Sequence, residues 1–210
     1  MGYAKETIEK YLEDAASDKP APGGGSISAL AGALAASMGE MAGRLTFGKK
    51  KFESVQQDVA NCVRRLSLCR RRLTALMDAD VMAYTSVNKA YGMPKGSAEE
   101  KGARKEAIRS ALLEAMKVPL NIMRECCTVG DTTARLVKIC NPNLITDGNV
   151  CAVLAEAACV ASRPLVEINL KTLKNAKLSA KTAPELDELT RRAARSRKQV
   201  SRLVKEFVSS

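Results

Sequence analysis

Asp80 is the residue of this 210-residue chain whose type and position best suit acid–base chemistry. Apolar side chains recur every three or four residues from Val55 to Met77, and the next two steps of that spacing reach Asp80 and Tyr84. Burial at such a core position raises the pKa of a carboxyl group toward values that suit proton transfer. A structural ion pair with an arginine of a neighbouring helix would explain the same pattern. Asp78 lies off this stripe and is expected to be a solvated neighbour.

The run Pro22-Gly23-Gly24-Gly25-Ser26 precedes a predicted helix and could bind an anion. Three consecutive glycines let backbone N–H groups approach a negative charge at a helix N-terminus, where the helix dipole is favourable. The run fits neither the Walker A pattern nor the G-x-G-x-x-G fingerprint. The plainer interpretation is a flexible turn in which Ser26 caps the helix. Thr146-Asp147 opens another predicted helix, and N-capping is the default role for such residues there too.

The chain contains no histidine, which excludes several kinds of site. A Ser-His-Asp or Cys-His nucleophile, a histidine-ligated metal and an imidazole pH switch all require that residue. Seven cysteines are present, but their number is odd and none forms a C-x-x-C pair. We therefore expect neither disulfides nor a metal site, and interpret the cysteines as small buried apolar residues in a reducing compartment.

The elements that must position these residues are predicted to be helices throughout. Apolar residues make up 46% of the chain but aromatic residues only 3%, so the core is built from residues that favour helices. No repeat or linker divides the chain, which predicts one all-α domain over residues 1–210. A capping box at Ser97 and Glu100 starts the fourth helix, and Pro119 is expected to kink that helix without ending it. The predicted helices span about 5–16, 27–46, 52–91, 98–140, 147–175 and 184–208.

No membrane segment or signal peptide is expected. The first 16 residues are charged and amphipathic, and the most apolar stretch, residues 27–47, contains Glu40 and Arg44. These features predict a soluble cytoplasmic protein.

The formal net charge of +11 raises the question of an anionic partner. Basic residues cluster at 49–51, at 70–72 and along the predicted last helix. Nucleic acid is disfavoured because no aromatic residues alternate with these charges to stack on bases. A solvated surface is the plainer interpretation of the basic last helix, and a small polyanionic ligand is a third option.

Several of these features occur together in one known family. The chain resembles the formiminotetrahydrofolate cyclodeaminases, which include stand-alone bacterial proteins and the C-terminal domain of formiminotransferase-cyclodeaminase. The resemblance covers nearly the whole chain, in the family's order and spacing. It is carried by the segments Pro22–Ser26, Leu45–Lys50, Leu76–Tyr84, Met93–Lys95, Glu99–Lys101, Val118–Leu120, Thr146-Asp147 and Ile168–Leu170.

The resemblance implies an elongated bundle of about six helices that forms a homodimer and acts on a tetrahydrofolate, often as the polyglutamate. It implies that Asp80 is the catalytic residue and that no metal or cofactor takes part. Substrate binding would fall to the remaining matched residues, which are Gly23, Gly24, Gly25, Ser26, Lys49, Lys50, Lys95, Asp147 and Asn169.

The implied reaction converts 5-formiminotetrahydrofolate to 5,10-methenyltetrahydrofolate with release of ammonia. A separate formiminotransferase would then be a partner. Two alternatives stay open: methenyltetrahydrofolate cyclohydrolase activity on the same scaffold, and a non-catalytic basic helical binding protein.

Overall fold

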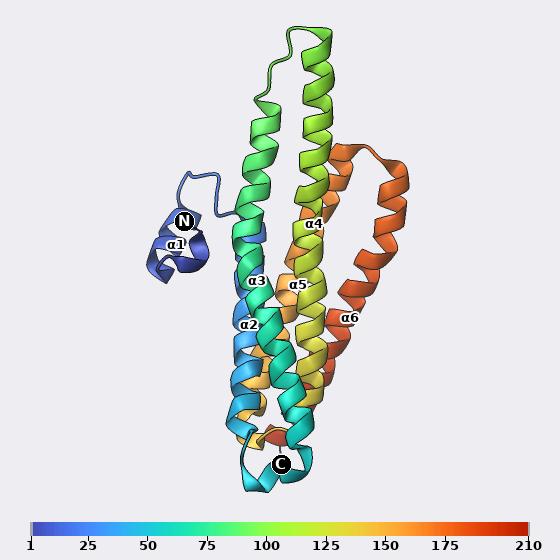
Figure 1. Cartoon of the computed structure of the whole chain (residues 1–210). Coiled ribbons are helices and arrows are strands. Elements are labelled where there is room, and N and C mark those ends of the chain that lie inside the picture. The colour runs from blue at the N-terminus through green and yellow to red at the C-terminus, as the bar shows by residue number, and fades with distance from the viewer. Residues whose placement is uncertain (1, 210) are drawn as a thin grey trace.

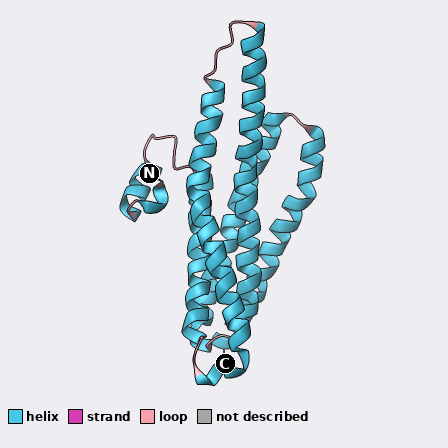
Figure 2. Ribbon diagram, in the orientation of Figure 1, coloured by secondary structure: helices cyan, strands magenta, loops and turns pink. Residues whose placement is uncertain are grey.

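The computed structural model describes residues 2–209, and in that part of the chain every regular element is a helix (Figure 2). The six-helix, all-α prediction is therefore confirmed. The α-helices are α1 (Ile8–Ala16), α2 (Gly24–Thr46), α3 (Gln56–Tyr91), α4 (Ala98–Leu136), α5 (Ile145–Leu173) and α6 (Ala176–Val208). Three short 3₁₀ helices, at Tyr3–Lys5, Lys50–Val55 and Pro142–Leu144, join them.

The long helices α2 to α5 form an elongated bundle, and α6 packs along α4 and α5 (Figure 1). The short α1 lies beside the N-terminal part of α2, and the α3–α4 hairpin extends beyond the ends of the other helices (Figure 1). Within the described residues, one segment, Pro142–Leu173, is long and apolar enough to cross a membrane by length and composition alone. The core helix of a bundle passes the same test.

Small residues on α2 let three neighbouring helices approach it closely. A Cβ atom on Gly32 would lie 2.8 Å from the Sγ atom of Cys126 on α4, and one on Gly39 would lie 3.1 Å from the Sγ atom of Cys151 on α5. Glycine costs about 1 kcal/mol relative to alanine inside a helix, so its repeated use here reflects tight interhelical packing.

Most helix boundaries follow local signals. Ser97 and Glu100 form the predicted capping box, and α4 continues through Pro119 as expected. Two N-cap predictions are wrong. Gly23 caps α2 and Leu144 caps α5, which places Ser26 and Thr146-Asp147 inside the first turns of these helices. The last helix starts at Ala176, eight residues before its predicted start, because the Asn175 side chain caps it.

The buried stripe of α3 follows the predicted spacing only as far as Met77. Val59, Leu66 and Leu73 are fully buried, whereas Tyr84 is 42% exposed. The core prediction for Tyr84 is therefore wrong. The reason is that α2 begins at Gly24, beside Asp80, so the C-terminal part of α3 has no α2 to pack against.

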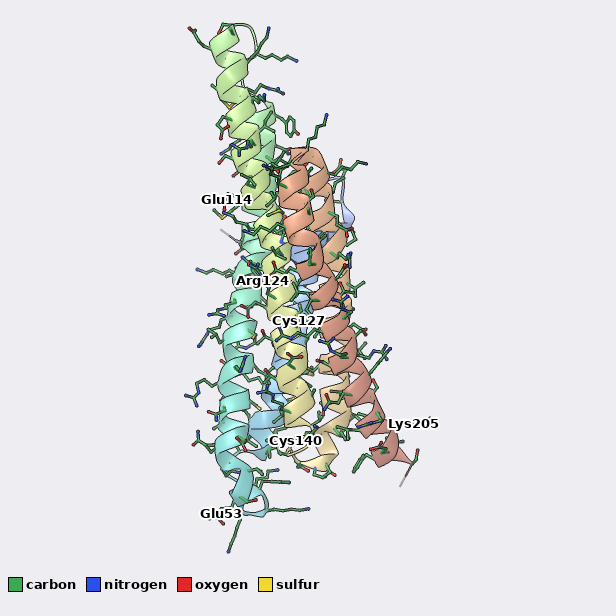
Figure 3. The ribbon with its side chains drawn as sticks, turned by 90° about the vertical axis from the view of Figure 1, so that its right-hand side faces the viewer. Glu53, Glu114, Arg124, Cys127, Cys140 and Lys205 are labelled. Carbon is green, nitrogen blue, oxygen red and sulfur yellow. The ribbon has the colours of Figure 1, made fainter. Side chains whose placement is uncertain are left out.

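All seven cysteines are free and buried, as predicted. The Sγ atoms of Cys127 on α4 and Cys159 on α5 are 3.9 Å apart, which is a packing contact and not a disulfide. In Figure 3 Cys127 lies on α4, and Cys140 lies four residues beyond the C-terminal end of that helix. Burial raises the pKa of Cys140 to about 11 and of Cys69 to about 12, so both remain thiols at neutral pH.

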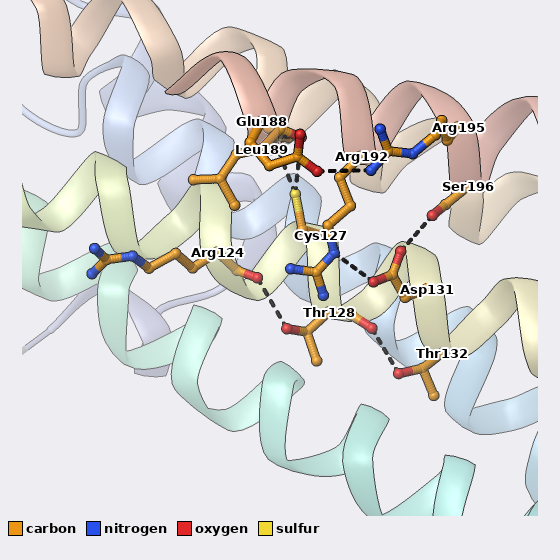
Figure 4. Close-up of polar contacts among 11 residues, drawn as sticks. Arg124, Cys127, Thr128, Asp131, Thr132, Glu188, Leu189, Arg192, Arg195 and Ser196 are labelled. Atoms are coloured by element: carbon orange, nitrogen blue, oxygen red, sulfur yellow. Dashed lines mark hydrogen bonds and ion pairs between the residues drawn. The ribbon is translucent and has the colours of Figure 1, made fainter. Parts of the chain in front are cut away.

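The basic last helix was expected to be a solvated surface, but several of its basic residues make ion pairs with other helices. Arg192 on α6 donates to Asp131 on α4 at 2.5 Å, and the Ser196 hydroxyl donates to the same carboxylate at 2.6 Å (Figure 4). Further along α6, Arg197 pairs with Glu156 on α5 at 2.8 Å. Part of the positive charge of α6 therefore joins it to the bundle.

Candidate active site

Asp80 lies against the N-terminal turn of α2. Its Oδ2 atom accepts a hydrogen bond of 3.0 Å from the backbone N–H of Ser26. A Cβ atom on Gly25 would overlap the carboxyl group, 2.8 Å from Oδ2 and closer still to Cγ and Oδ1. The glycine run therefore does place a helix N-terminus against an anion, and that anion is the carboxylate of Asp80.

Two opposing effects act on the Asp80 carboxyl group. Burial raises its pKa above the ordinary aspartate value, and the hydrogen bond from Ser26 lowers it, with burial the larger. Among the described residues no lysine or arginine pairs with this carboxylate, so the ion-pair interpretation left open by the sequence is not what the structure contains. A half-buried carboxylate with a raised pKa and no cationic partner is suited to accept and return a proton.

Asp80 opens into a cavity of about 280 Å³ where the end of α2 leaves a space between α3, α4 and α5. Among the described residues that line this cavity, Asp80 is the only one with a charged side chain, and Tyr84 and Asn169 add a hydroxyl and an amide. The rest of the lining is apolar or backbone. It comprises Pro20, Ala21, Gly23, Gly24, Gly25, Val81, Ala83, Val87, Ala115, Pro119, Leu165 and Ile168.

The first helix holds the α2 terminus in position. The Tyr11 hydroxyl and the Ser26 hydroxyl form a buried hydrogen bond of 2.9 Å. Asp78 accepts a 3.4 Å hydrogen bond from the backbone N–H of Ala4, so it fixes the N-terminal segment and is not the merely solvated neighbour that was expected. The first contact ties α1 to the first turn of α2, and the second ties the N-terminal segment to α3.

The structure brings together only some of the predicted site residues. Gly23, Gly24, Gly25, Asp80 and Asn169 line the cavity, and Ser26 supplies the N–H to Asp80. Asn169 uses its own amide N–H₂ on the carbonyl of Leu165, at 2.7 Å, which leaves its side-chain oxygen for other donors.

The other predicted site residues lie elsewhere in the same chain. Asp147 is 22 residues before Asn169 on α5, or about 33 Å at 1.5 Å per residue. Lys49 and Lys50 are at the same end as Asp147, because Thr46 Oγ1 accepts from the backbone N–H of Asn141 at 2.9 Å. Lys95 is exposed in the loop between α3 and α4.

Some lining residues were not predicted as site residues. Tyr84 follows Asp80 by one helical turn, and Leu165 and Ile168 precede Asn169 by four residues and one residue. A search for residues one turn from each candidate would have found Tyr84 and Leu165. No sequence signal places Ala115 and Pro119 of α4 opposite them.

This arrangement can bind a small, largely apolar ring system through a few polar groups and move one proton at a fixed position. Among the described residues no group of three potential ligands could hold a metal ion. Fold and site together define the class of an all-helical bundle whose cavity contains a single carboxylate.

Comparisons with known proteins identify the family within that class. The family described as formiminotransferase-cyclodeaminase matches residues 7–188. A methenyltetrahydrofolate cyclohydrolase from Methylorubrum extorquens is 35% identical over 97% of this chain and 98% of its own length. A formimidoyltransferase-cyclodeaminase from Gallus gallus is 30% identical over 97% of this chain and 37% of its own. The chain thus spans about a third of the length of that relative.

The fold is also that of a solved protein. A formiminotetrahydrofolate cyclodeaminase from Thermotoga maritima superposes with a TM-score of 0.87 and 27% identity, over 97% of this chain and 98% of that one. This chain belongs to the formiminotransferase-cyclodeaminase family, an enzyme family of folate one-carbon metabolism.

Proposed function

We propose that this protein hydrolyses 5,10-methenyltetrahydrofolate to 10-formyltetrahydrofolate. The observation that carries this choice is the end-to-end match to a relative named methenyltetrahydrofolate cyclohydrolase. The resemblance in the sequence favoured the cyclodeaminase reaction with the cyclohydrolase as its alternative, and this match reverses that order. Cyclodeamination of 5-formiminotetrahydrofolate is the second candidate, favoured by the structural likeness to the Thermotoga maritima cyclodeaminase.

In the hydrolytic reaction Asp80 acts as a base and then as an acid. The carboxylate takes a proton from water as the water oxygen bonds to the cationic carbon between N5 and N10. A tetrahedral carbon forms. The carboxyl group then returns the proton to N5 while the C–N5 bond breaks, and the hydroxyl proton is lost to solvent as the formyl carbonyl forms. One water is consumed and one proton is released.

In the deamination the carboxylate of Asp80 moves a proton from N10 to the nitrogen that leaves as ammonia. N10 attacks the carbon of the formimino group, whose nitrogen is protonated, and Asp80 takes the proton from N10. The proton passes to the departing nitrogen, and ammonia leaves as the methenyl bridge forms. Both reactions need the same positioned carboxylate, and neither needs a metal, a redox cofactor or a covalent nucleophile.

The raised pKa of Asp80 suits either route. A carboxyl group with an ordinary pKa holds its proton too weakly to return it efficiently to a nitrogen near neutral pH. The mostly apolar lining makes the surroundings of Asp80 less polar than water, and the backbone N–H of Ser26 at the start of α2 orients the carboxylate.

The deciding experiment offers the purified protein each substrate separately. We expect loss of methenyltetrahydrofolate to proceed much faster than its uncatalysed hydrolysis, with formyltetrahydrofolate as the product. Ammonia release from the formimino substrate without accelerated hydrolysis would instead establish the second candidate. Failure of both reactions, with salt-sensitive retention on DNA, would favour the non-catalytic alternative.

A further inference from the structure

A second cavity, of about 720 Å³, lies between the first part of α3 and the end of α4. The two helices run side by side here (Figure 3). We call this cavity the α3–α4 groove, and its walls include Arg64, Arg65, Arg135 and Lys138. Its volume falls within the range of about 300–1,000 Å³ that is typical of sites for small molecules.

The groove carries an excess of positive charge. Its four cationic side chains are those of Arg64, Arg65, Arg135 and Lys138, and its one carboxylate is that of Asp58. Within the described part of the chain, Asp58 makes no ion pair with any of these four residues. A concave surface lined by one sign of charge concentrates the electric field and attracts ions of the opposite sign. The groove is therefore suited to an anion.

The arginines of the groove differ from most arginines of the chain, which make an ion pair with an aspartate or a glutamate. Three of the exceptions line the α3–α4 groove, and Arg71 lines the adjoining hollow together with Arg64. The remaining one, Arg104, donates to the backbone carbonyl of Tyr91 at 3.1 Å. Unpaired guanidinium groups are therefore concentrated at one place and are not spread over the surface. Among the described residues the arginines without an acidic partner are Arg64, Arg65, Arg71, Arg104 and Arg135.

The ion pair between Arg72 on α3 and Glu125 on α4, at 3.0 Å, fixes how the two antiparallel helices align. Seven residues away on each helix, Arg65 lies at the level of Thr132, which offers no charge. Arg135 is three residues further along α4, or about 4.5 Å. The guanidinium groups of Arg65 and Arg135 therefore come from opposite walls of the groove, about one helical turn apart.

This spacing of guanidinium groups defines the chemistry of the ligand. A guanidinium binds a carboxylate or a phosphate through two parallel hydrogen bonds, so two of them on opposite walls suit two anionic groups on one molecule. Leu68, which is 38% exposed, and Ile139 offer apolar surface to the carbon skeleton of that molecule. Among the described residues of the lining none is aromatic, so the groove has nothing on which the bases of a nucleic acid could stack.

We propose that the α3–α4 groove is a second ligand site, and that it binds a small organic polyanion with at least two phosphate or carboxylate groups. Arg65 and Arg135 each hold one anionic group, and Lys138 adds a third positive charge. The ligand takes the place of the acidic side chains that pair with arginines elsewhere in the molecule.

This site is separate from the cavity of Asp80. The two cavities share none of their described lining residues. Arg65 precedes Asp80 by 15 residues on α3, which is about 22 Å along the helix axis. A small molecule held by the groove therefore does not reach the reacting atoms, and the inference goes beyond the proposed function.

Calorimetric titration with inorganic triphosphate and with citrate tests for the site. At an ionic strength of about 0.15 M, where the Debye length is about 8 Å, we expect one saturable site per chain for at least one of these anions. Tighter binding of triphosphate identifies a phosphorylated ligand, and tighter binding of citrate identifies a polycarboxylate. The absence of saturable binding for both anions would overturn the proposal.

The double variant Arg65→Gln/Arg135→Gln, called the groove variant, tests the location. We expect it to bind the anion at least about tenfold more weakly than the wild type, because two charge-assisted contacts are lost. Lys101→Gln/Lys105→Gln is the matched control, since it removes two exposed positive charges from the other end of α4. The control should bind like the wild type. Equal losses in the two variants would show attraction by net charge alone and would overturn the proposal.

Thermal unfolding distinguishes a ligand site from a structural role of the two arginines. Without an anion, the groove variant should be at least as stable as the wild type, because it has lost two unpaired like charges. A saturating anion should raise the melting temperature of the wild type and leave that of the groove variant nearly unchanged. A groove variant that is less stable without an anion would show that these arginines support the fold instead.

Competition with a folate tests whether the two cavities are independent. We expect saturating tetrahydrofolate monoglutamate to leave the affinity for the anion unchanged. Displacement of the anion would place it in the cavity of Asp80 and would contradict a second site. All of these measurements are made without turnover, so failure of the proposed reaction would leave their outcome intact.

Discussion

Asp80 is held in a position that favours reactivity over stability. Its carboxylate is half-buried, receives one backbone hydrogen bond and has no cationic partner among the described residues. Its ionised form is therefore less favourable in the folded chain than in water. Gly25 permits this contact because any larger residue would displace the carboxylate.

Replacing Asp80 by asparagine should separate function from stability. We expect kcat to fall by a factor of about 10² to 10⁴, the range typical of a lost proton-transfer group. The melting temperature at neutral pH should be unchanged or higher, because the amide oxygen can still accept from Ser26 and no charge is buried. Substrate assays and thermal unfolding on the same preparation measure both effects.

The pH dependence of the stability difference between the wild type and Asp80→Asn provides the control. A raised pKa means that the folded state binds the Asp80 proton more tightly than the unfolded state. The cost of ionisation is absent below the ordinary aspartate pKa, and it grows as pH rises through the raised value. The stability advantage of the asparagine variant should therefore shrink on acidification. A large loss of stability at neutral pH would show that the carboxylate supports the fold instead.

Gly25→Ala should damage the site by displacing the same carboxylate. The new Cβ would overlap Asp80, so we expect at least a tenfold loss of turnover and a destabilisation of about 1–3 kcal/mol. Gly102→Ala on α4 is the matched control, because nothing lies within 4 Å of its Cβ position. Equal effects of the two substitutions on kcat would contradict the close-contact argument.

The pairing of α2 with α3 includes a buried carboxylate with two arginines. Glu40 on α2 is 6% exposed, and its oxygens accept from Arg44 at 2.7 Å and from Arg70 on α3 at 2.8 Å. Burial alone would raise the pKa of Glu40, but the hydrogen bonds and charges of the two arginines outweigh it and lower the pKa. The network therefore stabilises the folded state while Glu40 is ionised.

Removing Arg70, the partner of Glu40 on α3, should show how much the folded state depends on this ion-pair network. Arg70→Met leaves Glu40 with Arg44 alone, and we expect a loss of about 2 kcal/mol, below the 3–5 kcal/mol typical of a fully broken buried pair. Arg71→Met, an exposed neighbour without an ion pair among the described residues, is the control. Because the folded pKa of Glu40 is lowered, the wild-type advantage is present above the ordinary glutamate pKa and is lost as pH falls through the lowered value. Urea unfolding at several pH values measures the difference in unfolding free energy between the wild type and Arg70→Met. A difference that does not change with pH would contradict the role of the ionised Glu40.

Local patterns predicted the elements and the key residue better than they predicted the contacts between elements. The α3 stripe and the Ser97–Glu100 box are properties of neighbouring residues, so the sequence contains them directly. The acid partners of Arg192 and Arg197 lie on other helices and have no local signal. Nor could periodicity show that α2 begins at the level of Asp80, which is what leaves Tyr84 exposed beside a cavity.

The whole molecule carries its positive charge unevenly, and this should affect substrate choice. With a net charge of +11, we expect a polyglutamylated folate to show a lower KM than the monoglutamate at low ionic strength. The difference in KM between the two substrates should become smaller as ionic strength rises from about 0.01 M to about 0.15 M, because the Debye length falls from about 30 Å to about 8 Å over that range.

Matched charge reversals locate the origin of this effect. Lys49→Glu/Lys50→Glu should remove most of the polyglutamate preference. Lys198→Glu/Lys205→Glu on α6 alters the net charge equally at positions that were not predicted to bind substrate. Steady-state kinetics with the monoglutamate and the polyglutamate compares the two double variants. Equal losses would indicate a general field of the molecule and not a local role for Lys49 and Lys50.

The placement of α2 between α3 and α5 constrains the order in which the molecule can assemble. The adjacent helices α3 and α4 are joined by a short loop and can pair early, because little chain entropy is lost in closing it. The helix α2 leaves the ribosome before either of them, yet it rests against α5, more than 100 residues later in the chain. The apolar surface of α2 that packs on α5 therefore stays exposed until α5 has been synthesised. The cavity is also incomplete until Asn169 has been added to the chain. Catalytic competence would then be among the last properties that a nascent chain acquires.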